Sequence, residues 1–325
     1  MTETILTKRA VNASRQFIET TARPLEIARF RYAFDDAPAE SVFNALKQYQ
    51  NSDGGFGQTL EPDLRARESS VLCTTIAFQV LRSTQTNPDP SLIASAMAYF
   101  LNTFQEKAGH WRIIPVSAEQ SAHAPWWNQT GREDTFDSFS LNPTAEILGY
   151  LYDHQDLVPA ELLLRLSKRV ILNLSELEKI EMHDLLCCLR LLQTRTLPEP
   201  VRGQLHQKLA DLVNGAVSWD PTQWKGYCLR PLQVIDDPQS PFLAGREESL
   251  RANLDYEIAS QNDDGSWTPT WTWGDAWPDD WTLARREWAG VITLEKLMLL
   301  QRFNRIEGSR DDPAGESVKP PLELS

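Results

Sequence analysis

The sequence lacks the features of a membrane or secreted protein. Its 325 residues contain no apolar run approaching the roughly 20 residues that are needed to span a bilayer. The amino terminus, MTETILTKRA, has no apolar stretch that could act as a secretion signal. We therefore expect a soluble, cytoplasmic protein without a membrane span.

Positive charge is also scarce. Lys and Arg number 32 against 45 Asp and Glu, which gives a net charge of -13 at pH 7. A chain with this balance has little attraction for a phosphate backbone or an anionic membrane surface. We expect no nucleic-acid partner, and the oligomeric state is left open.

Cysteine and histidine are too few to outline a metal centre. The cysteines have no Cys-x-x-Cys spacing, so free and mostly buried thiols are expected at Cys73, Cys187, Cys188 and Cys228. Among the histidines, only His123 in the string HAPWW suggests chemistry, as a base or a metal ligand, and it lacks a second His at ligand spacing. We predict no cofactor, with a divalent cation left open, and interpret His183 and His206 as structural or exposed residues on helices away from any site.

What the sequence does contain is a repeated phrase. QNSDGGF at 50–56, QEKAGHW at 105–111 and QNDDGSW at 261–267 share the spacing Gln-x-x-x-Gly-x-aromatic, and a weaker echo ends at Trp219. An amphipathic helical pattern precedes each phrase and a more apolar one follows it, which predicts an outer helix, a corner and an inner helix. A unit of about 50 residues is one helical hairpin, which must stack on its neighbours to bury its apolar face. We predict one all-α domain over residues 1–307, an α/α toroid of about five or six hairpins, and a disordered acidic, proline-rich tail over 308–325.

These phrases resemble the QW repeats of the squalene-hopene cyclase and protein prenyltransferase superfamily. QNSDGGFG at 50–57 is similar to the Gly-Gly-Phe-Gly loops of prenyltransferase β subunits, and QNDDGSW at 261–267 is similar to a cyclase QW motif. EPDL at 61–64 and HAPWW at 123–127 resemble a bacterial subgroup of small, single-toroid relatives. The resemblance covers about residues 35–305 and implies concentric inner and outer helices and an isoprenoid substrate.

The catalytic motifs of those families are absent. The Asp-x-Asp-Asp proton donor of cyclases would need Asp where this chain has Trp277, and the diphosphate-binding Asp-Asp-x-x-Asp would need Asp at Leu283. The Asp-x-Cys zinc ligands of prenyltransferases would need Asp at Gly226. Function must therefore be argued from the site rather than from the fold.

The loops that follow the phrases supply the candidate site, because all corners of one type should open at the same end of the ring. The substrate-binding candidates are Glu61, Asp63, Trp126, Trp127, Trp224, Tyr227, Trp271, Trp273, Trp277 and Trp281. The indole rings could stabilise a cation, stack on a sugar or simply fill space. Glu61 and Asp63 could form a turn around Pro62, or bind an ammonium group or a divalent cation.

Asp279 and Asp280 are the predicted catalytic acids, with His123 as a further catalytic candidate. Adjacent carboxylates flanked by Trp would resist double ionisation, and desolvation would help one of them to keep its proton. The alternative interpretation is that they begin a helix near Trp281.

Three functions remain open on this basis. The first is an isoprenoid-active enzyme that cyclises a polyene-type substrate by proton transfer, with a small hydrophobic or isoprenoid-like molecule as its partner. The second is a carbohydrate-active hydrolase or lyase that uses two carboxylates. The third is a non-catalytic toroid that binds a small molecule or acts as a scaffold.

Overall fold

The computed structural model describes residues 3–84, 86 and 88–308, so the predicted disordered tail lies outside the described residues except for Gly308. Within this part the chain is all α, as predicted, and contains isolated β-bridges but no strand. The helices are α1 (Lys8–Thr21), α2 (Pro24–Phe34), α3 (Ala39–Lys47), α4 (Val71–Ser83), α5 (Pro90–Thr103), α6 (Glu133–Phe136), α7 (Leu141–Asp153), α8 (Ala160–Glu176), α9 (Met182–Leu192), α10 (Glu199–Ala216), α11 (Glu247–Ala259) and α12 (Pro278–Arg302). None of the described helices combines the length and the apolar character that crossing a bilayer requires.

The repeated phrase forms the same corner in its first and last copies. In the first, the Gln50 side chain donates to the Gly54 carbonyl at 3.0 Å, and the Phe56 amide donates to Thr74 Oγ1 at 3.0 Å on the following helix. In the last, Gln261 donates to Gly265 at 3.1 Å and the Trp267 amide donates to Thr293 Oγ1 at 2.9 Å. The aromatic residues of all three copies are buried, as predicted: Phe56, Trp111 and Trp267.

Each phrase also packs through its glycine against a helix that lies elsewhere in the sequence. A Cβ on Gly54 would lie 2.3 Å from the carbonyl oxygen of Ser95 on α5, and one on Gly109 would lie 2.1 Å from the Arg169 guanidinium on α8. A Cβ on Gly265, in the last phrase, would lie 2.3 Å from backbone atoms of α1. The last repeat therefore packs on the first helix of the chain.

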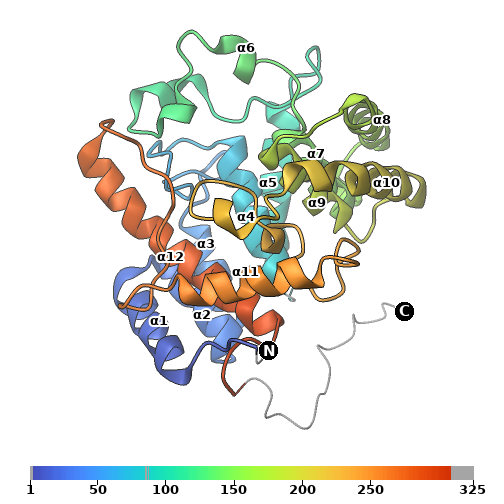
Figure 1. The fold of residues 1–325 in the computed structure, drawn as a ribbon. Helices are drawn as coiled ribbons and strands as arrows, with labels where there is room; N and C mark the ends of the chain where they lie inside the picture. Colours follow the sequence, from blue (N-terminus) through green and yellow to red (C-terminus); the bar gives the residue numbers. More distant parts are fainter. Residues whose placement is uncertain (1–2, 85, 87, 309–325) are drawn as a thin grey trace.

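Further contacts join the two ends of the described chain. Gln261 donates to Ser14 Oγ of α1 at 2.8 Å, and Ser14 donates to the Gly265 carbonyl at 2.6 Å. Leu6 pairs with Ile306 in a parallel bridge, and α1 packs against α12 (Figure 1). The first and last hairpins are thus neighbours.

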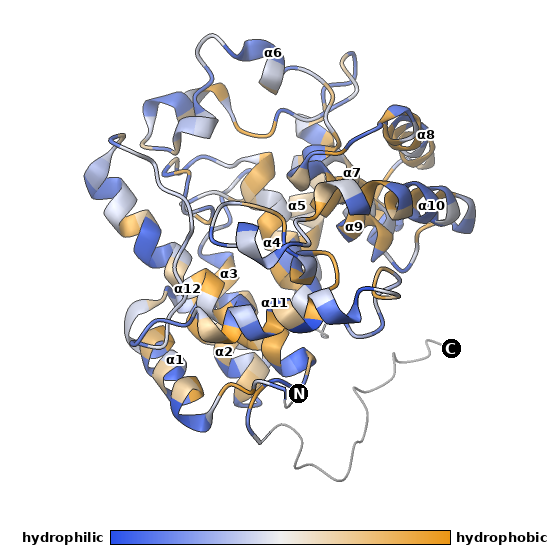
Figure 2. Ribbon diagram, in the orientation of Figure 1, coloured by the Kyte–Doolittle hydropathy of each residue, from blue (hydrophilic) through white to orange (hydrophobic). Residues whose placement is uncertain are grey.

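The helices that follow the phrases form the centre of the core. Packing links α4 to α7, α7 to α9, and α12 to α2, while α8 and α10 pack against each other. Figure 2 shows hydrophobic residues over much of α4 and hydrophilic residues over much of α10, as expected for buried and outward-facing helices. The described cysteines are all free, and three of them are buried, which confirms the prediction for the thiols.

The repeat that ends at Trp219 differs from the others. Two short 3₁₀ turns, η4 (Pro221–Gln223) and η5 (Pro231–Gln233), follow it where the other repeats have an α-helix. A groove of about 610 Å³ lies beside η5, between α9, α10 and residues 233–242. The missing helix leaves this part of the core less filled.

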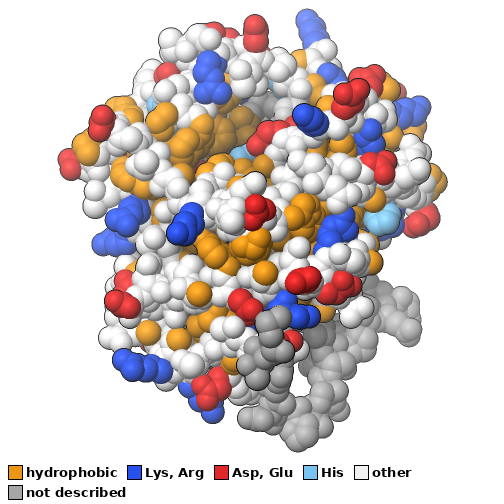
Figure 3. All heavy atoms as spheres, in the orientation of Figure 1, with side chains coloured by type: hydrophobic (Ala, Val, Ile, Leu, Met, Phe, Trp, Pro, Cys, Tyr) orange, Lys and Arg blue, Asp and Glu red, His pale blue; other side chains and the backbone are white. Residues whose placement is uncertain are grey.

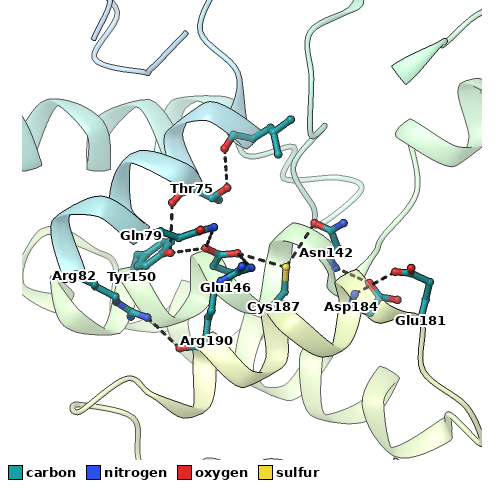
Figure 4. A network of polar contacts seen from close by, with 11 residues as sticks. Thr75, Gln79, Arg82, Asn142, Glu146, Tyr150, Glu181, Asp184, Cys187 and Arg190 are labelled. Atoms are coloured by element: carbon teal, nitrogen blue, oxygen red, sulfur yellow. Dashed lines mark hydrogen bonds and ion pairs between the residues drawn. The ribbon is translucent and has the colours of Figure 1, made fainter. Parts of the chain in front are cut away.

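A polar network crosses the inner helices α4, α7 and α9 (Figure 4). The buried Glu146 carboxylate of α7 accepts from Gln79 of α4 at 2.8 Å and from Arg190 of α9 at 3.0 Å, and the Cys187 thiol lies 3.5 Å away. A carboxylate held by several donors is compensated for its burial. The interior of this fold is therefore not purely apolar.

Candidate functional site

Segments far apart in the sequence converge around two carboxylates. Residues 61–65 run antiparallel to residues 122–124, with the Arg65 amide donating to Ala122 at 2.9 Å and the Ala124 amide donating to Asp63 at 2.9 Å. From the loop before α12, the indole nitrogens of Trp273 and Trp271 donate to the Asp63 carboxylate at 2.8 and 3.2 Å. Hydrogen bonds therefore confirm the predicted convergence for the loops after the first, second and last phrases.

The loop after Trp219 joins the same group through an aromatic contact. The Tyr227 and Trp271 rings are perpendicular, with centroids 5.9 Å apart. We call the surroundings of Glu61 and Asp63 the aromatic mouth; its rings are those of Tyr227, Trp271, Trp273, Trp281 and Trp288. On the same face, Figure 3 shows a hollow with largely hydrophobic walls, bordered by the segment that carries α6 and by the start of α12.

Glu61 and Asp63 are buried, with exposed fractions of 7% and 3%. Burial raises the pKa of Glu61 to about 8, and the nearby Asp63 adds to the rise. Burial also raises the pKa of Asp63, but the indole N–H groups of Trp273, Trp288 and Trp271 oppose this by favouring its charged form. Glu61 is thus the group that keeps its proton near neutral pH, while the indole donors limit the rise in the pKa of Asp63.

The nearby cations do not neutralise this pair, because each has its own partner. Arg23 forms two hydrogen bonds of 2.8 Å to Glu26, and its effect on Glu61 is smaller than that of burial. Arg65 forms a 2.6 Å ion pair with Glu287. The arrangement therefore retains a protonated acid in Glu61 rather than a salt bridge.

Indole rings surround the carboxylates. Trp271 and Trp288 meet edge to face at 5.1 Å, and Trp273 lies 5.6 Å from Trp281 between ring centroids. Trp127 packs on the same cluster as Trp273 and Trp281. Among the described residues the buried Trp288 indole nitrogen has no partner with full hydrogen-bond geometry.

His123 lies beside this site but has no free ring nitrogen. Its Nδ1 is 2.6 Å from the Ser121 carbonyl and its Nε2 is 2.8 Å from the Asn128 side-chain oxygen. Both nitrogens are therefore committed to the loop that His123 holds together, which leaves none for a metal ion or a substrate. Within the described residues, no three His, Cys, Asp or Glu side chains form a group able to hold a metal ion.

Asp279 and Asp280 occupy the first turn of α12, which matches the alternative interpretation of this pair. Asp279 is exposed and Asp280 is half-buried, so Asp279 lacks the desolvation on which its predicted acid role depends. The preceding Trp277 caps the helix with φ of 49°, rare for a bulky side chain, and is 47% exposed. Trp126 is likewise exposed, on η2 (Pro125–Trp127).

Trp224 does not contribute to the mouth. It is fully buried, donates from its indole nitrogen to the Ser218 carbonyl at 2.7 Å, and packs edge to face on Tyr256. Its predicted role in substrate binding is corrected to a role in the core.

The position of His183 and Glu181 beside the aromatic mouth was not predicted from the sequence. His183 was expected away from any site, yet its Nε2 lies 3.0 Å from the Tyr227 hydroxyl, and its Nδ1 lies 3.0 Å from Glu181. The corner between α8 and α9 carries no recognisable phrase, so the start of α9 could not be placed beside the other loops. The regular spacing of about 50 residues was the only signal that could have placed it.

Charged side chains continue along the inner helices beyond the mouth. Glu295 lies two turns further along α12 than Trp288, about 10 Å on. It is accessible to water, and the charges of Arg29, Arg190 and Lys296 favour its ionised form. Charged side chains from α2, α9 and α12 therefore surround Glu295.

A scan against models of known protein families finds no match for this chain, and a search of curated proteins finds none either. The resemblance to QW repeats is neither supported nor opposed by these comparisons.

Proposed function

We propose that this protein is an enzyme that protonates an uncharged small molecule, with Glu61 as the proton donor. The observation that carries the proposal is a buried Glu61, protonated near neutral pH, beside an Asp63 whose carboxylate accepts hydrogen bonds from indole N–H groups. A general acid needs a pKa near the working pH, and burial next to a like charge provides it. The family resemblance makes a polyene of isoprenoid type the preferred substrate class.

The proposal includes the predicted α/α toroid as the scaffold. It is supported by the packing of each phrase on a helix that lies elsewhere in the sequence, with the last phrase on α1. Such contacts are those that a closed ring, rather than an open stack, would require, and a closed ring would point the loops after the phrases toward one end. The convergence of these loops on Asp63 is what a ring of this kind would produce.

The proposed chemistry begins with transfer of the Glu61 proton to a carbon of an alkene, or to the oxygen of an epoxide. With an alkene, the electron pair of the double bond forms the new C–H bond and leaves a cation on the other carbon. With an epoxide, an oxygen lone pair forms the O–H bond, and a C–O bond then breaks with its electron pair going to oxygen, which leaves a cation on carbon. The Glu61 carboxylate that results lies, like Asp63, close to the developing positive charge. The faces of Trp271 and Trp281 would stabilise the cation by about 0.5 to 2 kcal/mol each. Asp279 and Asp280 have no part in this step.

A carbohydrate substrate is the second candidate. It is favoured by the charged side chains of Glu295, Arg190 and Lys296, because such groups suit a molecule with many hydroxyl groups better than a long hydrocarbon. The same Glu61 would then protonate a glycosidic oxygen, and the indole rings would stack on sugar rings.

The test is turnover in D₂O of linear polyprene alcohols, their terminal epoxides and aryl glycosides by the full chain. Initiation by Glu61 on an alkene places one solvent deuterium on carbon, which mass spectrometry of the product detects. Glu61→Gln, which keeps the shape of the protonated acid, is expected to lower the rate by about 10² to 10⁴-fold. Asp279→Asn is the control and is expected to leave the rate unchanged.

Full activity of Glu61→Gln would overturn the assignment of the acid. Turnover of aryl glycosides alone would select the second candidate, and binding without turnover of any class would favour the non-catalytic interpretation.

A further inference from the structure

Tyr227 connects the aromatic mouth to a histidine and a carboxylate on another element. Its hydroxyl lies 3.0 Å from His183 Nε2, and the two rings are stacked with centroids 6.3 Å apart. His183 Nδ1 in turn lies 3.0 and 3.2 Å from the two oxygens of Glu181. These residues form a continuous hydrogen-bonded chain, which we call the Tyr–His–Glu chain.

The start of α9 fixes the position of this chain. Glu181 is the N-cap of α9, and its carboxylate accepts from the backbone amides of His183 at 2.6 Å and Asp184 at 3.4 Å (Figure 4). Because the helix holds the carboxylate, Glu181 can accept the Nδ1 proton of His183 in a fixed geometry. The other ring nitrogen, Nε2, then carries the lone pair and accepts from the Tyr227 hydroxyl.

Trp271 contacts both this chain and the carboxylate pair. The Trp271 ring packs edge to face on Tyr227 at 5.9 Å, while its nitrogen donates to Asp63 at 3.2 Å. Tyr227 is 57% exposed, so its ring is open to a molecule in the mouth. Burial raises the pKa of Tyr227 to about 12, with the carboxylates Glu181, Asp63 and Glu61 adding to the rise, so its hydroxyl is neutral and keeps a proton to donate.

We propose that Tyr227 and His183 act together as the base that ends the reaction, and that Glu181 positions His183 for this step. The proposal rests on the proposed function, in which Glu61 forms a cation on the substrate. A C–H bond next to the cationic carbon breaks, and its electron pair forms the product double bond. The released proton passes to Tyr227 Oη while the hydroxyl proton of Tyr227 passes to His183 Nε2. The imidazolium that results is stabilised by Glu181, and solvent at the exposed mouth then removes the proton.

This assignment separates the acid from the base. Glu61 lies on the loop after the first phrase, whereas Tyr227 and His183 lie after Trp219 and at the start of α9. A base placed beside Glu61 could remove the proton from the carbon that had just received it, which would reverse the first step. Placement of the acid and the base on different segments lets one part of the molecule gain a proton while another loses one.

A purely structural role for these residues, as a helix cap and a ring contact, makes different predictions. The first test needs no substrate: ¹⁵N-edited NMR of the full chain locates the proton of the His183 ring. We expect a neutral ring with its proton on Nδ1 in the wild type, because Glu181 accepts it there. A proton on Nε2 would overturn the proposal, since His183 would then donate to Tyr227 and could not receive its proton.

The second test measures the products formed in D₂O. Loss of a proton gives an alkene, whereas capture of the cation by water gives an alcohol. Among deuterium-labelled products, Tyr227→Phe and His183→Asn are each expected to lower the ratio of alkene to alcohol by about 10-fold or more. Glu181→Gln, which can still cap α9, is expected to lower the ratio less.

Tyr256→Phe serves as the matched control. It removes a tyrosine hydroxyl that donates to the Trp224 carbonyl at 2.9 Å, away from His183, and should leave the ratio unchanged. An unchanged ratio in both Tyr227→Phe and His183→Asn would overturn the assignment of the base while leaving that of Glu61 intact. A wild type that forms no labelled product would instead refute the proposed function itself, and the NMR measurement would still decide whether His183 can accept the Tyr227 proton.

Discussion

The burial of Glu61 makes a prediction about stability that does not depend on the substrate. In the unfolded chain this carboxyl ionises near its ordinary pKa of 4.5, whereas in the folded protein it keeps its proton to about pH 8. Between these values the folded state binds one proton more than the unfolded state, so stability falls as pH rises. The fall amounts to about 1.4 kcal/mol per pH unit, or roughly 4 kcal/mol between pH 5 and pH 8.

Glu61→Gln removes this dependence, because Gln has no proton to lose and resembles protonated Glu in shape. At pH 5 the variant should differ little from the wild type. By pH 8 it should gain roughly 4 kcal/mol in its free energy of unfolding relative to the wild type. The measurement is urea unfolding followed by tryptophan fluorescence at pH 5, 6.5 and 8 and constant ionic strength.

The exposed Glu68 offers a matched control, since Glu68→Gln removes the same charge without a buried site. Its difference from the wild type should stay within about 0.5 kcal/mol at every pH. If the difference between Glu61→Gln and the wild type varied by less than about 1 kcal/mol over this range, Glu61 would ionise near its ordinary pKa. The argument for a retained proton, and with it the proposed acid, would then fail.

Three further predictions concern the corners and the mouth. Gly54→Ala should lower the free energy of unfolding by more than about 3 kcal/mol, because the new Cβ would lie 2.3 Å from a backbone oxygen. Gly131→Ala, also at positive φ but in open space, should lower it by about 1 kcal/mol. Equal losses for the two variants in thermal unfolding would contradict this explanation. Trp273→Phe removes the 2.8 Å hydrogen bond to Asp63 and should lower the free energy of unfolding by about 2 kcal/mol at pH 7. Urea unfolding measures this loss, and an unchanged midpoint would contradict the prediction. Gln261→Ala should speed amide hydrogen exchange in α1 and lower the free energy of unfolding by about 1 to 2 kcal/mol. Faster exchange in residues 261–267 alone would contradict the packing of this corner on α1.

The repeated corners could be predicted from the sequence because their geometry is local. A glycine at fixed distance from a glutamine and an aromatic residue specifies a turn that side chains and backbone complete among themselves. The spacing also predicted that Phe56, Trp111 and Trp267 would be buried. The convergence of loops followed from the repetition of one corner type.

The relative importance of the acids could not be predicted in this way. Asp279 and Asp280 are adjacent in sequence, which suggests mutual repulsion, but the start of α12 leaves Asp279 in water. Glu61 gains its raised pKa from burial, which depends on tertiary packing of segments distant in the chain. For the same reason, sequence alone did not separate Trp224, which packs in the core, from Trp271, which binds Asp63.

The docking of the last repeat on α1 has a consequence for the order in which the protein is made. α1 is the first described helix to leave the ribosome, but the residues that bind Ser14 are synthesised about 250 residues later. At a synthesis rate of about 5 to 20 residues per second, this face of α1 stays uncovered for roughly 10 to 50 seconds. Until then α2 is the neighbour already available to it. A chain that stops short of residue 261 therefore leaves this face of α1 exposed, although most of its helices are complete.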